Sequence, residues 1–104
     1  MIVAWIHTTA PDALRTILDE MNQDQSSFTL FHILGSGSDV QEVKKGLNVP
    51  STCHYYQIKL GFVIEHNQSR WLTHDEISNG VIRAIQEKNP LTVVGSLEPW
   101  SMRP

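Results

Sequence analysis

The sequence predicts a ferredoxin-like α+β fold, in which a four-stranded antiparallel sheet carries two main helices on one face and a short extra helix follows strand 2. The chain has 104 residues, which is enough for one domain and too few for two ordinary cores. Segments whose apolar residues repeat every two positions alternate with segments in which they repeat every three or four. We expect one domain at 1–98 and a C-terminal tail at 99–104.

The first third of the chain predicts two strands around a helix. Residues 1–7 alternate between apolar faces, which indicates a strand. Thr9 is placed to cap a helix that runs to about Asn22, with apolar residues at helical spacing. Residues 28–34 are apolar on both faces except at His32, which predicts a strand buried on both sides or at an interface.

The middle of the chain predicts a short helix and a long strand. Ser38 and Gln41 resemble a capping box after a glycine-rich turn, and Pro50 ends this helix. Residues 55–65 alternate as a long strand with one buried face. Gly61 within that strand predicts a bulge or a close approach of another backbone segment.

The last third predicts a turn, a helix and a final strand. Residues 66–70 are polar and predict a turn, and Thr73 with Glu76 forms a capping box for a helix that ends near Asn89. Residues 91–97 alternate again as a strand. The right-handed crossover rule places both main helices on one face of the sheet, so we expect the other face to be uncovered.

Composition excludes several classes of protein. Charged residues make up 18% of the chain and apolar residues 40%, a balance that favours folding over disorder. A net charge of −3 argues against binding duplex DNA. Cys53 is the only cysteine, and a lone thiol fits a reducing compartment. With neither a signal peptide nor a membrane-spanning apolar run in the sequence, we expect a cytoplasmic protein.

The expected uncovered face of the sheet supplies the main candidate binding surface. Its residues come from two neighbouring strands and are Trp5, His7, Tyr55, Gln57 and Lys59. Aromatic side chains with few charges are typical of protein interfaces. We therefore expect a small binding or regulatory protein that acts through protein–protein contacts, most simply as a homodimer. The alternative is that this face of the sheet has no binding role, because the tail that contains Trp100 or the loop at Pro50 covers it.

Two other functions fit the same fold. Aromatic residues on an open sheet can stack on the bases of single-stranded RNA, so an RNA-binding protein or a ribonuclease is one alternative. A small enzyme that uses His7, His32 or His54 as acid or base is the other. The usual aromatic and basic motif of RNA-binding sheets is absent from the sequence, and no catalytic set is visible.

The remaining motifs are weaker. The loop Gly35, Ser36, Gly37 and Ser38 follows a strand and precedes a helix, where backbone amides can bind an anion, but it lacks the lysine and glycine spacing of a phosphate loop. The five histidines show no metal-ligand spacing, so we expect neither a metal nor another cofactor. Nothing in the sequence identifies Cys53 as a nucleophile, and we expect an incidental thiol.

Overall fold

The computed structural model describes residues 2–4, 15–20, 27–47 and 49–104. The main sheet consists of β1 (Ile2–Ala4), β2 (Phe28–Leu34), β3 (Cys53–Leu60) and β6 (Leu91–Val94). A separate hairpin consists of β4 (Phe62–Glu65) and β5 (Gln68–Trp71). The helical segments are residues 15–20, α2 (Val40–Leu47), α3 (His74–Glu87) and the short 3₁₀ helix η1 (Trp100–Met102).

The main sheet is parallel, so the expected antiparallel ferredoxin-like sheet is wrong. Its strands lie in the order β1-β2-β3-β6, and every neighbouring pair is parallel. A segment with helical residues separates each strand of the main sheet from the next. Such a crossover returns the chain to the end of the sheet where the previous strand began, so the next strand runs in the same direction. In β2, every residue except Thr29 is buried. Burial on both faces is typical of parallel strands between helix layers.

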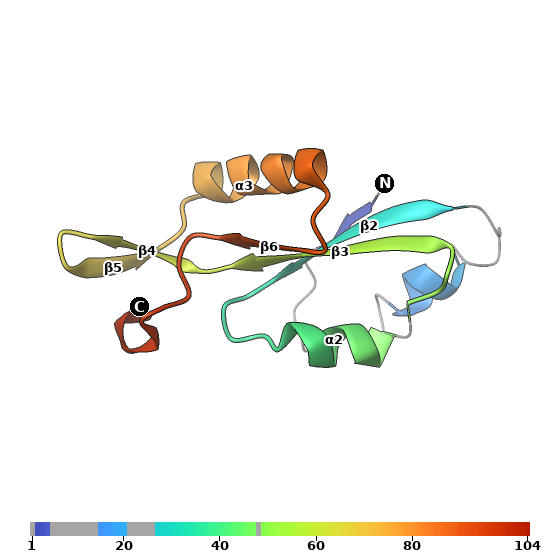
Figure 1. Cartoon of the computed structure of the whole chain (residues 1–104), viewed down its shortest axis with the longest axis horizontal. Helices are drawn as coiled ribbons and strands as arrows, with labels where there is room; N and C mark the ends of the chain where they lie inside the picture. The colour runs from blue at the N-terminus through green and yellow to red at the C-terminus, as the bar shows by residue number, and fades with distance from the viewer. Residues whose placement is uncertain (1, 5–14, 21–26, 48) are drawn as a thin grey trace.

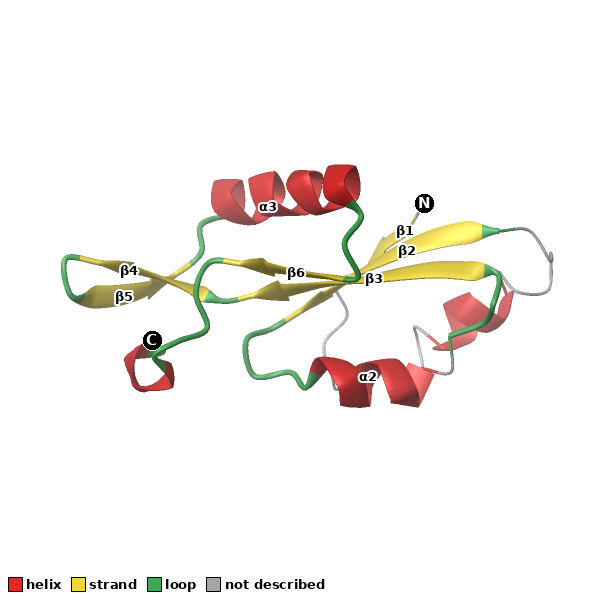
Figure 2. Ribbon diagram, viewed as in Figure 1, coloured by secondary structure: helices red, strands yellow, loops and turns green. Residues whose placement is uncertain are grey.

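Helices cover both faces of the main sheet (Figure 1). On one face, Leu18 from residues 15–20 and Leu47 from α2 pack in a cluster with Leu30 of β2. On the other face, Ala84 of α3 packs in a cluster with Phe31 and Ile58. The expectation that the main helices share one face is therefore wrong, and the supposedly uncovered face of β3 lies against α2 (Figure 2).

The helices begin largely where the sequence predicts. The capping box of α3 is confirmed, because Thr73 Oγ1 accepts from the Glu76 amide and Glu76 Oε1 accepts from the Thr73 amide. For α2 the cap lies one residue later than expected, because the carboxylate of Asp39 accepts from the first-turn amides in place of the Ser38 hydroxyl. None of the described helices is both long and apolar enough to cross a membrane.

Gly61 divides the predicted long strand into β3 and β4. A Cβ atom at this position would collide with the backbone of Ser96, which confirms the predicted close approach. Beyond Gly61, His66 and Asn67 both adopt positive φ, as a tight hairpin turn requires, and the chain returns as β5. The prediction of a simple polar turn at 66–70 missed this strand. The hairpin projects past the main sheet and lengthens the molecule to 50 Å (Figure 1).

Candidate functional site at the ends of β2 and β5

A gap in the strand pairing lies beside the junction of β3 and β4. β2 ends opposite Lys59, where Leu34 is the last paired residue. β5 ends opposite Phe62, where Trp71 is the last paired residue. On the other edge, Phe62 exchanges hydrogen bonds with Ser96, so β5 must lie on the same edge as β2. Two strand ends therefore meet along this edge, with residues 60 and 61 between them.

The two chain segments leave this gap toward opposite faces of the sheet. After β2 the chain passes to α2, and after β5 it passes to α3, and these helices lie on opposite faces (Figure 2). In open parallel sheets, ligands bind outside the carboxyl ends of the strands where successive connections diverge in this way. The topology alone thus marks this gap as the first place to look for a binding site.

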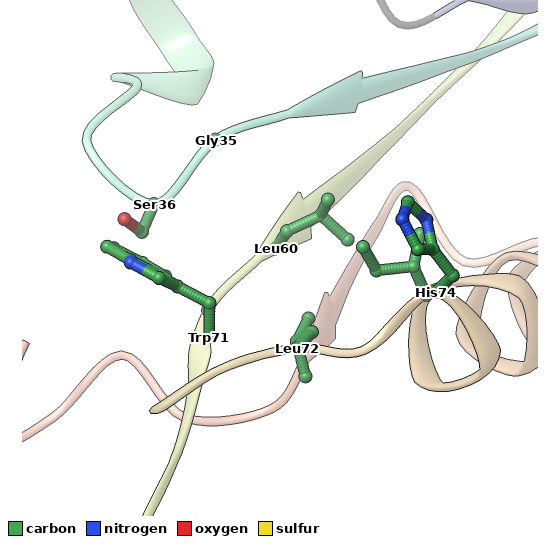
Figure 3. Close-up of a pocket in the computed structure, with 8 residues that line it drawn as sticks. Gly35, Ser36, Leu60, Trp71, Leu72 and His74 are labelled. Atoms are coloured by element: carbon green, nitrogen blue, oxygen red, sulfur yellow. The ribbon is translucent and has the colours of Figure 1, made fainter. Parts of the chain in front are cut away.

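A pocket of about 340 Å³ occupies the gap (Figure 3). Its volume lies near the lower end of the range of roughly 300–1,000 Å³ that is typical of ligand sites, so it suits a single side chain or a small group. Trp71 and Ser36 stand together at one end, and His74 stands at the other. The lining residues are Gly35, Ser36, Leu60, Gly61, Trp71, Leu72, His74 and Ile77. Apart from the indole N–H of Trp71, Ser36 and His74 carry the only polar side-chain groups among these described residues, so the pocket is mainly apolar.

Trp71 is held at the rim of the pocket although 48% of its surface is exposed. The guanidinium of Arg103 lies over its ring, 5.5 Å from the ring centre, in a cation–π contact. Arg103 Nε also donates to Ser36 Oγ at 3.2 Å. Ser36 itself is buried. These contacts join the C-terminal segment, the loop after β2 and the hairpin around one pocket.

The predicted anion loop forms the wall between this pocket and a second hollow. Gly35 and Ser36 line the apolar pocket, whereas Ser36, Gly37 and Ser38 line the second hollow together with Lys59. Asp39 also lines the second hollow, and its carboxylate accepts from the first amides of α2. A carboxylate therefore occupies the position where an anion would have to bind.

The predicted sheet-face residues on β3 are brought together, beneath α2. Gln57 is 6% exposed, and its Nε2 donates to the Val40 carbonyl at 2.8 Å and to the Tyr55 hydroxyl at 3.2 Å. The Tyr55 hydroxyl also lies 2.8 Å from His32 Nδ1. Lys59 is half-buried and lines the second hollow. The other two predicted members, Trp5 and His7, lie outside the described residues.

The contacts in this network fix its protonation. Because Tyr55 accepts from Gln57, its own proton is best donated to Nδ1 of a neutral His32. Burial lowers the pKa of His32, and burial raises the pKa of Tyr55 to about 12. Both side chains are therefore neutral near pH 7, and the network ties β2, β3 and α2 together.

The other candidate chemistry is not assembled at the pocket. His54 lies at the start of β3, at the opposite end of the strand from the pocket. Burial raises the pKa of the Cys53 thiol, which disfavours a reactive thiolate. Within the described parts of the chain, no group of three or more His, Cys, Asp or Glu side chains could hold a metal ion.

Sequence reasoning missed most of the pocket. Neither Trp71 nor His74 is among the predicted site residues, because the pattern at 66–70 indicates a turn in place of β5 and His74 is an exposed residue at the start of α3. The alternation of Gln68–Trp71 directly after Asn67 was the available signal for a hairpin. For Arg103 the sequence carries no signal. No known protein family, curated protein or solved structure compared with this chain matches it.

Proposed function

We propose that the chain is a small binding protein that acts through protein–protein contacts at the pocket beside Trp71. The observation that carries this proposal is an apolar pocket at the divergence of two connections, with a half-exposed tryptophan on its rim. Binding hot spots are enriched in tryptophan and arginine and cluster around well-packed pockets of this kind. The pocket would take one apolar side chain of a partner protein.

This proposal moves the working surface from the face of β3 to the ends of β2 and β5. Gln57 and Tyr55 are engaged with each other and with neighbouring elements, so they cannot stack on RNA bases without displacing α2. The pocket lining offers one imidazole, that of His74, and no described carboxylate. An apolar pocket with so little polar chemistry suits recognition of a side chain better than catalysis.

The experiment is selection of displayed random peptides against the chain, followed by titration of a synthesised winner. We expect winners to share an apolar residue, and Trp71→Ala to weaken their binding by about thirtyfold or more, as for other tryptophan hot spots. Ile82→Ala is the matched control, because Ile82 is 53% exposed on α3 and does not line the pocket. Unchanged binding by Trp71→Ala would contradict the proposal.

A second variant obstructs the pocket while keeping the indole ring of Trp71. A Cβ at Gly35 would meet nothing within 4 Å, and Gly35 does not have a positive φ, so the backbone tolerates a side chain there. Gly35→Leu should therefore fold normally and block binding from the rim. If Gly35→Leu and Trp71→Ala both keep their circular dichroism spectrum and both bind the winner normally, the pocket is not the binding site.

A further inference from the structure

The charges around the pocket are unevenly distributed. The chain as a whole carries a net charge of −3, yet no described carboxylate lines the apolar pocket. The guanidinium of Arg103 lies at its rim, over Trp71, and the imidazole of His74 closes the opposite end. A cation, Arg103, therefore lies beside an apolar pocket that no described carboxylate lines.

Arg103 is positioned by contacts that orient its guanidinium. The hydrogen bond to Ser36 is made by Nε, and a Cβ built on Gly37 would lie 3.8 Å from Nη2. The cation–π contact places the guanidinium 5.5 Å from the ring centre of Trp71, which lines the pocket. A planar guanidinium held in this way is well suited to recognising a carboxylate.

A second cation lies across the Ser36 loop. Lys59 lines the neighbouring hollow, and among the described residues it has no ion-pair partner. The carboxylate in that hollow, from Asp39, already accepts from two backbone amides of α2. Arg103 and Lys59 therefore both lie close to the Ser36 loop.

We infer that the pocket recognises a partner segment in which an acidic residue directly neighbours the apolar anchor side chain. The inference rests on the proposed function and specifies its ligand. The apolar side chain fills the pocket under Trp71, and the adjacent carboxylate pairs with Arg103 at the rim. This arrangement satisfies both features of the site, because the anchor is desolvated while the charged pair stays at the exposed edge.

The test uses three acetylated and amidated pentapeptides, Gly-Ser-Leu-Glu-Gly, Gly-Ser-Leu-Gln-Gly and Gly-Ser-Ala-Glu-Gly, titrated against the ¹⁵N-labelled chain by NMR. We expect the Leu-Glu peptide to bind about threefold to tenfold more tightly than the Leu-Gln peptide, and this difference to shrink in 1 M NaCl. The Ala-Glu peptide should bind more weakly than either. Equal affinities of the Leu-Glu and Leu-Gln peptides would overturn the inference and leave the proposed function standing.

Two substitutions of Arg103 locate the effect. Arg103→Gln should bring the ratio of the Leu-Glu to the Leu-Gln affinity close to one, and Arg103→Lys should restore part of that ratio. If Trp71→Ala loses all peptide binding, the pocket is the binding site. If Arg103→Gln keeps the preference for glutamate, Arg103 does not select the acidic residue and the inference is wrong. If sodium 4-methylpentanoate binds as tightly as the Leu-Glu peptide, the site selects small carboxylic acids and the inferred peptide partner is wrong.

Discussion

Replacing Gln57 by glutamate tests whether α2 covers the face of β3. The side chain is buried, and its amide nitrogen donates to the backbone carbonyl of Val40 at 2.8 Å. Gln57→Glu keeps the size of the side chain but turns this donor into an ionised acceptor. The introduced carboxylate would face a carbonyl oxygen in a region with little water.

The size of the effect follows from two contributions. Loss of the hydrogen bond costs about 1 kcal/mol, and leaving a charge buried without a partner costs about 3–5 kcal/mol. Protonation limits the total, since holding a carboxyl of ordinary pKa neutral at pH 7 costs about 3.7 kcal/mol. Reorientation of the Tyr55 hydroxyl toward the carboxylate recovers part of the loss. We expect a net destabilisation of about 3 kcal/mol at pH 7.

Urea titrations followed by circular dichroism at several pH values measure the destabilisation caused by Gln57→Glu. Burial raises the pKa of the introduced carboxyl in the folded state, so the deficit relative to the native chain is complete above that pKa and shrinks as the pH falls. Gln41→Glu is the matched control, because Gln41 is exposed in the first turn of α2, where a negative charge is neutral or slightly stabilising. A deficit at Gln57 as small as that at Gln41 would refute the placement of α2.

Four further outcomes follow from the same contacts. Burial lowers the pKa of His32 below 6.5, so the free energy of unfolding should be constant above pH 6.5, fall as the pH drops below 6.5 and level off beneath the folded-state pKa. In urea titrations, His32→Gln should flatten this part of the dependence of stability on pH. Thr92 Oγ1 is buried without a partner among the described residues, so Thr92→Val should raise the free energy of unfolding by about 1 kcal/mol in the same assay. Thr29 and His54 lie opposite each other in the parallel register, so cysteines at these two positions should form a disulfide in a chain that lacks Cys53. An antiparallel pairing of the same strands would keep the two cysteines apart. Peptide mass mapping distinguishes the two outcomes. The homodimer expected from the sequence should give twice 11.8 kDa by native mass spectrometry, and Val93→Lys on the exposed outer strand should shift it to monomer. A native chain that is monomeric at low micromolar concentration would contradict that expectation.

Local patterns predicted most of the elements. The apolar segment at 28–34 is a strand, the alternating segment predicted at 91–97 is a strand over 91–94, and the capping box at Thr73 starts a helix. These signals depend on neighbours within a few residues. Gly61 was also interpreted correctly, since only a residue without Cβ fits beside the Ser96 backbone. The direction of pairing was not predicted. It depends on treating the short helix α2 as a crossover between two adjacent strands, which turns neighbouring strands parallel.

One sequence feature already favoured the parallel sheet. The strand at 28–34 is apolar on both faces, which fits a strand between two helix layers better than a sheet with one open face. The sequence does not predict how His32 is buried, because a polar side chain inside a strand needs a buried hydrogen-bond partner. Its partner, the Tyr55 hydroxyl, lies 23 residues away in the sequence, and no local pattern announces that contact.

The candidate pocket could not have been predicted without the topology. Its lining comes from the loop after β2, the junction of β3 and β4, the end of β5 and the start of α3. These segments meet only because β2 and β5 end against the same edge and their connections diverge to opposite faces. An antiparallel arrangement would leave Trp71 in a solvent-exposed turn with no reason to expect a pocket beneath it. The binding proposal therefore depends on the parallel register of β2 and β3, and a failure of the disulfide between positions 29 and 54 would remove its structural basis.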